Sequence, residues 1–169
     1  MTISPVRGVI PGHGEDEVLA ITLPQNVHHF ASLLVVTHND DRKTQLLCRD
    51  YYRHGVRCFV TDQDPRRADA LEVGVKMLGR DGWLLMLQPN IAVPADVLCT
   101  GVFKPGYLHL ANGCNPVDFF LFHGSDWRLR RRPWFDHREA NSRRSFVSHW
   151  PAASRVLLPH RVYQTRKAV

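Results

Sequence analysis

Short apolar runs alternate with helix-like segments through the first hundred residues of this 169-residue chain, and this alternation constrains the fold more than any other feature. Strands are expected at 6–10, 30–37, 56–60 and 83–87, and helices at 15–23, 40–54 and 68–78. Strand, helix and strand in turn, joined by short connections, predict right-handed βαβ units and a parallel sheet. We therefore expect an α/β fold.

The expected helices carry recognisable start and stop signals. Acidic residues from Glu15 onward fill the first turn of the first helix, and Pro24 is expected to end it. Asp40 or Asp41 can cap the second helix, and Gly55 can stop it. The third helix has one apolar stripe, made by Ala68, Leu71, Val75 and Leu78.

The stretch GWLLMLQPNIAVP, residues 82–94, contains the most apolar of the expected strands. That strand ends in the tripeptide Gln88-Pro89-Asn90, at its carboxyl end. Open α/β sheets bind their ligands at the carboxyl ends of their strands. Polar residues also follow the neighbouring strands, namely Thr37, Asp40 and Asp62. The sequence therefore predicts a ligand site at this edge of the sheet.

Four segments of the chain resemble glycosyltransferases of the A-type, nucleotide-diphospho-sugar transferase fold, of the family-2 kind. They are LAITLPQN (19–26), HHFASLLVVTHNDD (28–41), GVRCFVTD (55–62) and ALEVGVKMLGRDGWLLMLQPNIAVP (70–94). A further stretch, RRSFVSHWPAASRVLLP (143–159), is similar to the closing segment of that family.

The resemblance implies a Rossmann-like, mostly parallel sheet with flanking helices and a short C-terminal half. It also implies a single domain over residues 1–169. In that domain, residues 1–98 would form the nucleotide-binding half, and residues 99–169 a shortened, basic half on the acceptor side.

The chain departs from the family where a cation would be bound. The family frame reads GWxLxLDADIVLP, and Gln88 and Asn90 stand at its two acidic positions. A neutral amide offers a carbonyl dipole where Mn²⁺ or Mg²⁺ needs a charged oxygen, so we expect no divalent metal there. A histidine near the C-terminus often completes the family's metal site. Tyr163 and Gln164 stand in the corresponding stretch, although His160 lies close by.

The resemblance also implies which residues meet the nucleotide-sugar donor. They are Thr37, Asp40, Asp62, Arg66, Arg67, Gln88 and Asn90. Without a metal, arginines can bind the departing diphosphate, because a guanidinium stays charged and pairs with phosphate oxygens. The arginines of residues 128–132 are further candidates. Each has a plainer interpretation: a solvated helix start for 66–67, a surface ridge for 128–132, and an amide finishing a turn for Asn90.

An inverting transfer needs a base for the acceptor hydroxyl, usually a carboxylate. Asp118 interrupts an apolar run, and Asp136 follows the pair Trp134-Phe135, so these two residues are the candidate catalytic bases. A structural role is the alternative for both of them.

Charge is unevenly distributed along the chain. Residues 1–100 hold 10 Lys/Arg and 12 Asp/Glu, whereas residues 101–169 hold 12 and 4. A basic second half indicates either an anionic partner or a solvated basic face. Because Trp127, Trp134 and Trp150 are interleaved with the arginines, binding of nucleic acid is one alternative, although no recognised nucleic-acid motif is present.

The patterns of cysteine, histidine and apolar residues indicate what to expect of the compartment, of metal motifs and of membrane spans. The four cysteines form no CxxC pair, so we expect reduced thiols in a cytoplasmic protein. The ten histidines show neither HxxxH nor HExxH spacing, so we expect them to be scattered. No apolar stretch reaches the roughly 20 residues that span a bilayer, so we expect no membrane span.

These observations give one leading hypothesis and two alternatives. The leading one is a glycosyltransferase-like protein that binds a nucleotide-sugar and transfers the sugar to an unknown acceptor without a metal at residues 88–90. A degenerate transferase that binds a nucleotide or a partner without turnover is the second. A basic nucleic-acid-binding protein is the third. A partner chain, such as a second copy, could complete the acceptor side.

Overall fold

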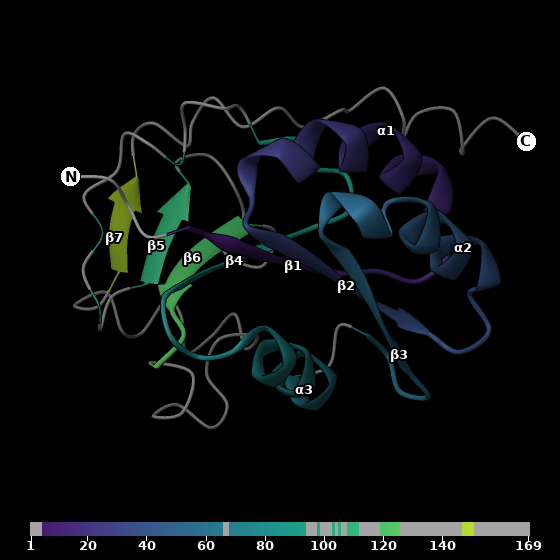
Figure 1. Cartoon of the computed structure of the whole chain (residues 1–169). Coiled ribbons are helices and arrows are strands. Elements are labelled where there is room, and N and C mark those ends of the chain that lie inside the picture. The colour runs from purple at the N-terminus through teal and green to yellow at the C-terminus, as the bar shows by residue number, and fades with distance from the viewer. Residues whose placement is uncertain are drawn as a thin grey trace, which may run out of the picture.

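The computed structural model describes residues 5–65, 68–93, 98, 103, 105, 108–111, 119–125 and 147–150. These residues contain a seven-stranded sheet in the order β3-β2-β1-β4-β6-β5-β7 (Figure 1). The strands are β1 (Arg7–Pro11), β2 (Ser32–His38), β3 (Val56–Thr61), β4 (Trp83–Leu87), β5 (Leu108–Ala111), β6 (Phe119–His123) and β7 (Val147–Trp150). The helices are α1 (Asp16–Asn26), α2 (Arg42–Asp50) and α3 (Ala68–Leu78), with short 3-10 turns η1 (Val27–His29) and η2 (Tyr52–His54).

The first four strands form the parallel core that the sequence predicts. β1 pairs in parallel with β2 on one side and with β4 on the other, and β2 pairs in parallel with β3. β6 joins β4 in the antiparallel sense, β5 is antiparallel to β6, and β7 is parallel to β5. The sheet is therefore mostly parallel, and β4 lies at its centre.

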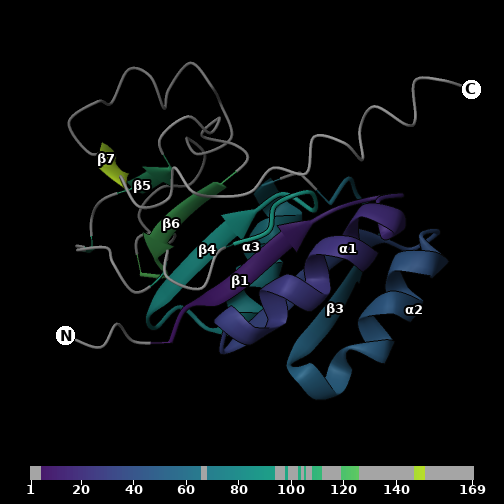
Figure 2. The same cartoon turned by 90° about the horizontal axis from the view of Figure 1, so that it is seen from above.

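Helices cover both faces of this sheet. α1 and α2 lie over one face and α3 over the other (Figures 1 and 2). Between these helices β4 is buried along its whole length and β2 along all but its two end residues, because successive side chains point to opposite faces that are both covered. On β2, Leu33 and Val35 pack with the residues of α1 and α2, whereas Leu34 and Val36 pack beneath α3. All four side chains are buried.

The predicted elements of the parallel core match the structure closely, although the first helix continues past Pro24 and the second ends at Asp50, before the expected residue 54. The proline was expected to end the first helix, but α1 runs through it to Asn26. Pro24 removes only the hydrogen bond to the carbonyl of Ala20, an exposed residue whose carbonyl water can reach. The residues after it are held by contacts of Asn26 with the chain beyond β4, so the helix continues.

The sequence predicts the glycine after α2 correctly but predicts the strands beyond β4 only in part. Gly55 adopts a left-handed conformation with φ of 84°, as expected of a stop residue, but the turn before it is a separate 3-10 turn. β6 overlaps the apolar run that Asp118 interrupts, VDFFLF at 117–122. β5 and β7 were not expected, because neither has a pronounced apolar pattern.

The structure also bears on two further features considered in the sequence, membrane-spanning helices and the cysteines. In the described part of the chain, no helix is long and apolar enough to cross a membrane. Cys48, which is buried, and Cys58, which is half-buried, are both free thiols.

Candidate functional site

The carboxyl ends of β1, β2, β3 and β4 meet along one edge of the sheet, because these four strands are parallel. We call the loops that follow them, residues 12–15, 39–41, 62–65 and 88–93, the carboxyl edge. The chain moves outward from β1 to β2 and β3, and then returns to place β4 on the other side of β1. Such a reversal is the usual ligand position in an open α/β sheet.

The turn after β4 is fastened to α1 by two buried polar side chains. The Thr22 hydroxyl donates to the carbonyl of Pro89 at 2.5 Å. The Asn26 amide donates to the carbonyl of Ile91 at 2.7 Å and accepts from the N–H of Val93 at 2.8 Å. Both side chains belong to fully buried residues. The backbone at positions 88–93 therefore has a fixed course.

The loop after β1 touches this turn through Gly12. A Cβ at Gly12 would lie 3.0 Å from Cγ of Pro89 and 3.0 Å from Oε2 of Glu15. Contacts this short leave no room for a side chain unless a neighbour moves. The ends of β1 and β4 are therefore in close contact at the point where the strand order reverses.

The oxygen atoms at this turn are poor ligands for a divalent cation. The N–H of Ile91 donates to the carbonyl of Gln88 at 3.1 Å, and the carbonyl of Pro89 already accepts from Thr22. The side chains of Gln88 and Asn90 are neutral amides, whereas Mn²⁺ and Mg²⁺ are bound by charged carboxylate oxygens.

Asp41 joins three parts of the neighbouring region. One of its carboxylate oxygens accepts from the N–H of Gly14 at 2.7 Å and from the hydroxyl of Thr37 at 3.0 Å. The other accepts from the N–H of Thr44 at 3.2 Å, which makes Asp41 the N-cap of α2 and confirms the capping role. Burial acts to raise the pKa of Asp41, but these hydrogen bonds outweigh it, and the pKa lies below its usual value.

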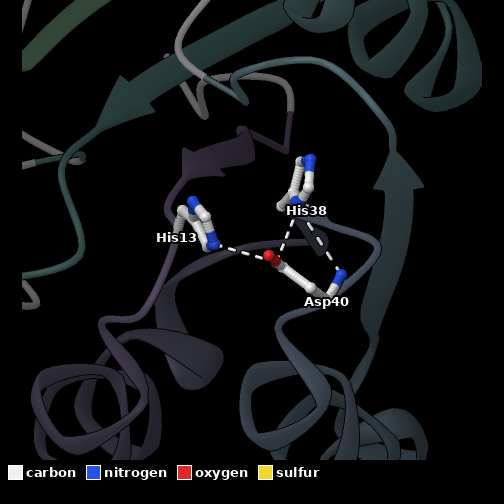
Figure 3. Close-up of side chains that lie close together, drawn as sticks. All are labelled: His13, His38 and Asp40. Atoms are coloured by element: carbon white, nitrogen blue, oxygen red, sulfur yellow. Dashed lines mark hydrogen bonds and ion pairs between the residues drawn. The ribbon is translucent and has the colours of Figure 1, made fainter.

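Three ionisable side chains, those of His13, His38 and Asp40, converge at one point of the carboxyl edge (Figure 3). Nε2 of His13 lies 2.9 Å from Oδ1 of Asp40, and Nδ1 of His38 lies 2.6 Å from the same oxygen. The two imidazole rings are 4.9 Å apart between centroids. We call these three residues the histidine–aspartate cluster. The hydrogen bond with Asp40 raises the pKa of His38, and the same bond lowers the pKa of Asp40.

The end of β3 is tied to this cluster. Nε2 of His38 lies 3.3 Å from the carbonyl oxygen of Asp62, and the side-chain amide of Asn39 donates to the Asp62 carboxylate. The N–H of Asn39 donates to the carbonyl of Thr61 at 3.0 Å. The loops after β2 and β3 therefore form one hydrogen-bonded unit.

The structure brings five of the predicted donor-binding residues to this edge. Thr37, Asp40, Asp62, Gln88 and Asn90 all lie at or just beyond the ends of β2, β3 and β4. Thr37 is buried, with its hydroxyl directed at Asp41. The other predicted residues lie outside the described part of the chain, namely Arg66, Arg67, Asp118, Asp136, the arginines of 128–132, His160, Tyr163 and Gln164.

Sequence reasoning missed His13, His38, Thr22 and Asn26. The two histidines are 25 residues apart in the sequence and fit no metal motif, so nothing in their spacing singles them out. A usable signal was present, because both follow predicted neighbouring strands at the same end. Thr22 and Asn26 lie four residues apart on one helix face, a weak pattern for an anchor.

Comparisons with known proteins bear on the fold. No protein-family model and no curated protein matches the sequence. Among solved structures, the glycosyltransferase GlyE of Streptococcus pneumoniae TIGR4 superposes with a TM-score of 0.53 at 12% identity, over 76% of this chain and 36% of that one. GalNAc-T7 with UDP, GalNAc and Mn2+ gives 0.50 at 15% identity, over 63% of this chain and 22% of that one.

A nucleotidyltransferase superposes over more of its length. A putative glucose-1-phosphate thymidylyltransferase from Bacillus anthracis gives a TM-score of 0.59 at 10% identity, over 97% of this chain and 96% of that one. This chain thus spans about a third or less of the two glycosyltransferases and nearly all of the thymidylyltransferase. It has the nucleotide-diphospho-sugar transferase fold, as the sequence predicts.

Proposed function

We propose that this chain is a glycosyltransferase-like protein that binds the nucleoside diphosphate part of a nucleotide-sugar at the carboxyl edge, beyond the ends of β2, β3 and β4. The fold supports the proposal, because the superposed proteins act on or contain nucleotides and sugars by their names. Fold alone does not specify an activity, so the argument depends on the residues of the edge.

One observation carries the proposal: polar side chains from three strand ends lie along the edge where the strand order reverses. Asp40 and Asp62 follow β2 and β3, and Gln88 and Asn90 follow β4 across β1 from them. Carboxylates and amides bind ribose hydroxyls and base edges through hydrogen bonds. We propose that Asp40 and Asp62 meet the nucleoside and that the residues after β4 meet the diphosphate.

The chemistry proposed at the diphosphate does without a cation at residues 88–90. Negative charge develops on the departing diphosphate as the anomeric bond breaks, and a donor aimed at such charge contributes about 3–4 kcal/mol. The turn after β4 offers neutral amides and backbone. We propose that Arg66 and Arg67, which directly precede α3 in the sequence, supply the positive charge, and that Asp118 or Asp136 serves as the base.

Binding without turnover is the second candidate. It is favoured by the same turn, because the two amides leave the developing charge without the carboxylate-bound cation that the family frame provides. The two candidates share the donor site and differ only in whether sugar is released or transferred.

Thermal denaturation tests donor binding. The full chain, stripped of metal with a chelator, is heated with UDP-, GDP-, TDP- and CDP-sugars, each with and without added Mn²⁺. A ligand at ten times its Kd should add about 1.4 kcal/mol, which corresponds to a rise in Tm of about 3–6 °C for a chain of this size. We expect one nucleotide class to give this rise, and Mn²⁺ not to enlarge it.

The controls separate the outcomes. The free sugar and the sugar 1-phosphate should give no rise, because they lack the nucleoside. Release of nucleoside diphosphate over hours, followed by chromatography, distinguishes an enzyme from a binding protein. If none of the four classes changes Tm at millimolar concentration, the proposed donor site is wrong.

A further inference from the structure

The histidine–aspartate cluster presents three metal-binding atoms to a single point. The three ligand atoms, one each from His13, His38 and Asp40, lie within 4.8 Å of one another. Parallel pairing of β1 with β2 brings them together: Pro11 is opposite Val36, and the N–H of Gly12 donates to the carbonyl of Val36 at 3.0 Å. In the described part of the chain, no other group of this kind is found.

Hydrogen-bond chemistry limits the arrangements of protons at this point. A carboxylate oxygen accepts only, and here two ring nitrogens face the same oxygen of Asp40 at 2.6 and 2.9 Å. Nε2 of His38 lies 3.3 Å from the carbonyl oxygen of Asp62, and the tautomer that carries its proton on Nε2 donates there. In that tautomer the lone pair of Nδ1 faces the Asp40 carboxylate and the N–H of Asp40, which lies 3.5 Å away, so Nδ1 is able to bind a metal.

The contact between His38 and Asp62 is also the arrangement typical of a metal-bound histidine. Such a histidine donates its second ring N–H to a carbonyl or a carboxylate, which fixes the tautomer and the ring orientation. The loop itself is held in place, since the side-chain amide of Gln45 donates to the carbonyls of His38 and Asn39, both at 3.1 Å. Asp41 accepts a hydrogen bond from the N–H of Gly14, and this bond holds the backbone next to His13 in place.

We propose that His13, His38 and Asp40 form a binding site for a divalent transition-metal ion of the zinc class. Two imidazole nitrogens and one carboxylate oxygen are ligands that suit Zn²⁺ and its neighbours, whereas Mg²⁺ and Ca²⁺ take oxygen ligands. Three protein ligands leave a fourth position open, as in catalytic rather than structural zinc sites. The site is separate from the turn after β4, and although Asp40 is also proposed to meet the nucleoside, binding of the metal itself does not depend on the proposed nucleotide-sugar activity.

The geometry must adjust to accept the ion, since the nitrogen–oxygen pairs must separate slightly and the most distant pair of ligand atoms, up to 4.8 Å apart, must close by up to about 1.5 Å. Zinc bonds to nitrogen and oxygen of about 2.0–2.2 Å place tetrahedral ligand atoms about 3.3 Å apart. The two nitrogen–oxygen distances here are 2.9 and 2.6 Å, so the side chains must separate by about half an ångström. The side chains of His13 and Asp40 are 48% and 63% exposed, which leaves them free to make this movement and leaves the open position accessible.

The test is calorimetric titration of the metal-free full chain with Zn²⁺, repeated with Co²⁺, whose visible absorption reports nitrogen and oxygen ligation. We expect one equivalent to bind to the wild type. His38→Asn and Asp40→Asn, which keep the size of each side chain, should weaken binding at least about 100-fold, and His13→Ala should do the same. His54→Ala is the matched control, because His54 is an exposed histidine before β3 at the opposite edge, and it should bind as the wild type does.

The proposal is overturned if the wild type takes up no Zn²⁺ at tens of micromolar, which would leave only a protonated histidine pair at the cluster. It is also overturned if the three variants bind as tightly as the wild type, or if Cys58→Ser abolishes binding while His38→Asn does not. Circular dichroism and Tm identify the variants that remain folded. If His13→Ala does not fold, the two conservative variants decide the question alone.

Discussion

Two adjacent parts of the carboxyl edge differ in what they offer to a ligand. The turn after β4 presents neutral amides at Gln88 and Asn90, and its backbone is fastened to α1. The loops after β1 and β2 present three ionisable side chains at one point, on a backbone fastened by Asp41. In both parts a buried polar residue holds the backbone in place, whereas the side chains that could meet a ligand differ in charge.

The largest effect is expected beneath the turn. Asn26→Leu would leave the buried carbonyl of Ile91 and the buried N–H of Val93 without their partners. We expect a loss of about 3 kcal/mol in the free energy of unfolding, since each unsatisfied buried group costs about 1–3 kcal/mol. Urea denaturation measures it.

Gln25→Leu is the matched control for this variant. Gln25 is the exposed neighbour of Asn26, and its side chain bonds only to the carbonyl of Ile21 in its own helix. It should change stability by less than about 0.5 kcal/mol. Equal losses in the two variants would show that Asn26 does not anchor the turn.

A smaller loss is expected beneath the other part of the edge. Asp41→Ala removes the N-cap of α2 and the partners of Gly14 and Thr37, and should cost about 2 kcal/mol. Asp40→Ala, one residue earlier and exposed, should destabilise the protein far less. Chemical denaturation measures both losses. A larger loss for Asp40→Ala than for Asp41→Ala would show that Asp41 does not hold this part of the edge.

The sequence predicts the parallel core of this fold well because its signals are local. β4 has the predicted bounds, since an apolar run is enclosed by Gly82 and by Gln88-Pro89. Pro24 was misjudged because the contacts that continue α1 come from residues 91 and 93, far along the chain.

The candidate site is predicted only in part, for the same reason. Position at the carboxyl ends follows from the strand order, so Asp40, Asp62 and Asn90 were placed at the correct edge. That His13 meets His38 depends on the register of β1 against β2, which no local pattern encodes.

Contact between the two parts of the edge can be tested at Gly12. Gly12→Ala would bring a methyl group to 3.0 Å from Pro89 and should cost about 1–2 kcal/mol. The same change in a Pro89→Ala background, where Cγ is absent, should cost about 0.5–1 kcal/mol less. A double-mutant cycle by denaturation measures the coupling, and strict additivity would mean that the loop and the turn do not touch.

The smallest change in stability is expected when the turn is given the charge it lacks. Gln88→Asp with Asn90→Asp alters two half-buried side chains and leaves the bonds from Thr22 and Asn26 in place, so stability should change less than in the variants above. If β4 ends beside the diphosphate, the double variant should gain Mn²⁺ affinity in the presence of the nucleotide that raises Tm, because two carboxylates and phosphate oxygens then share the ion.

Calorimetry with Mn²⁺ measures this gain, and exchanging the two amides, Gln88→Asn with Asn90→Gln, is the control that adds no charge. Mn²⁺ is the weakest binder of the first-row divalent ions, so the histidine–aspartate cluster should contribute little signal, and His38→Asn in the same background removes what remains. Uptake by the charged variant alone would place the diphosphate over β4. A nucleotide that binds while no variant takes up Mn²⁺ would instead place it toward β1 and β2, where the ionisable groups already lie.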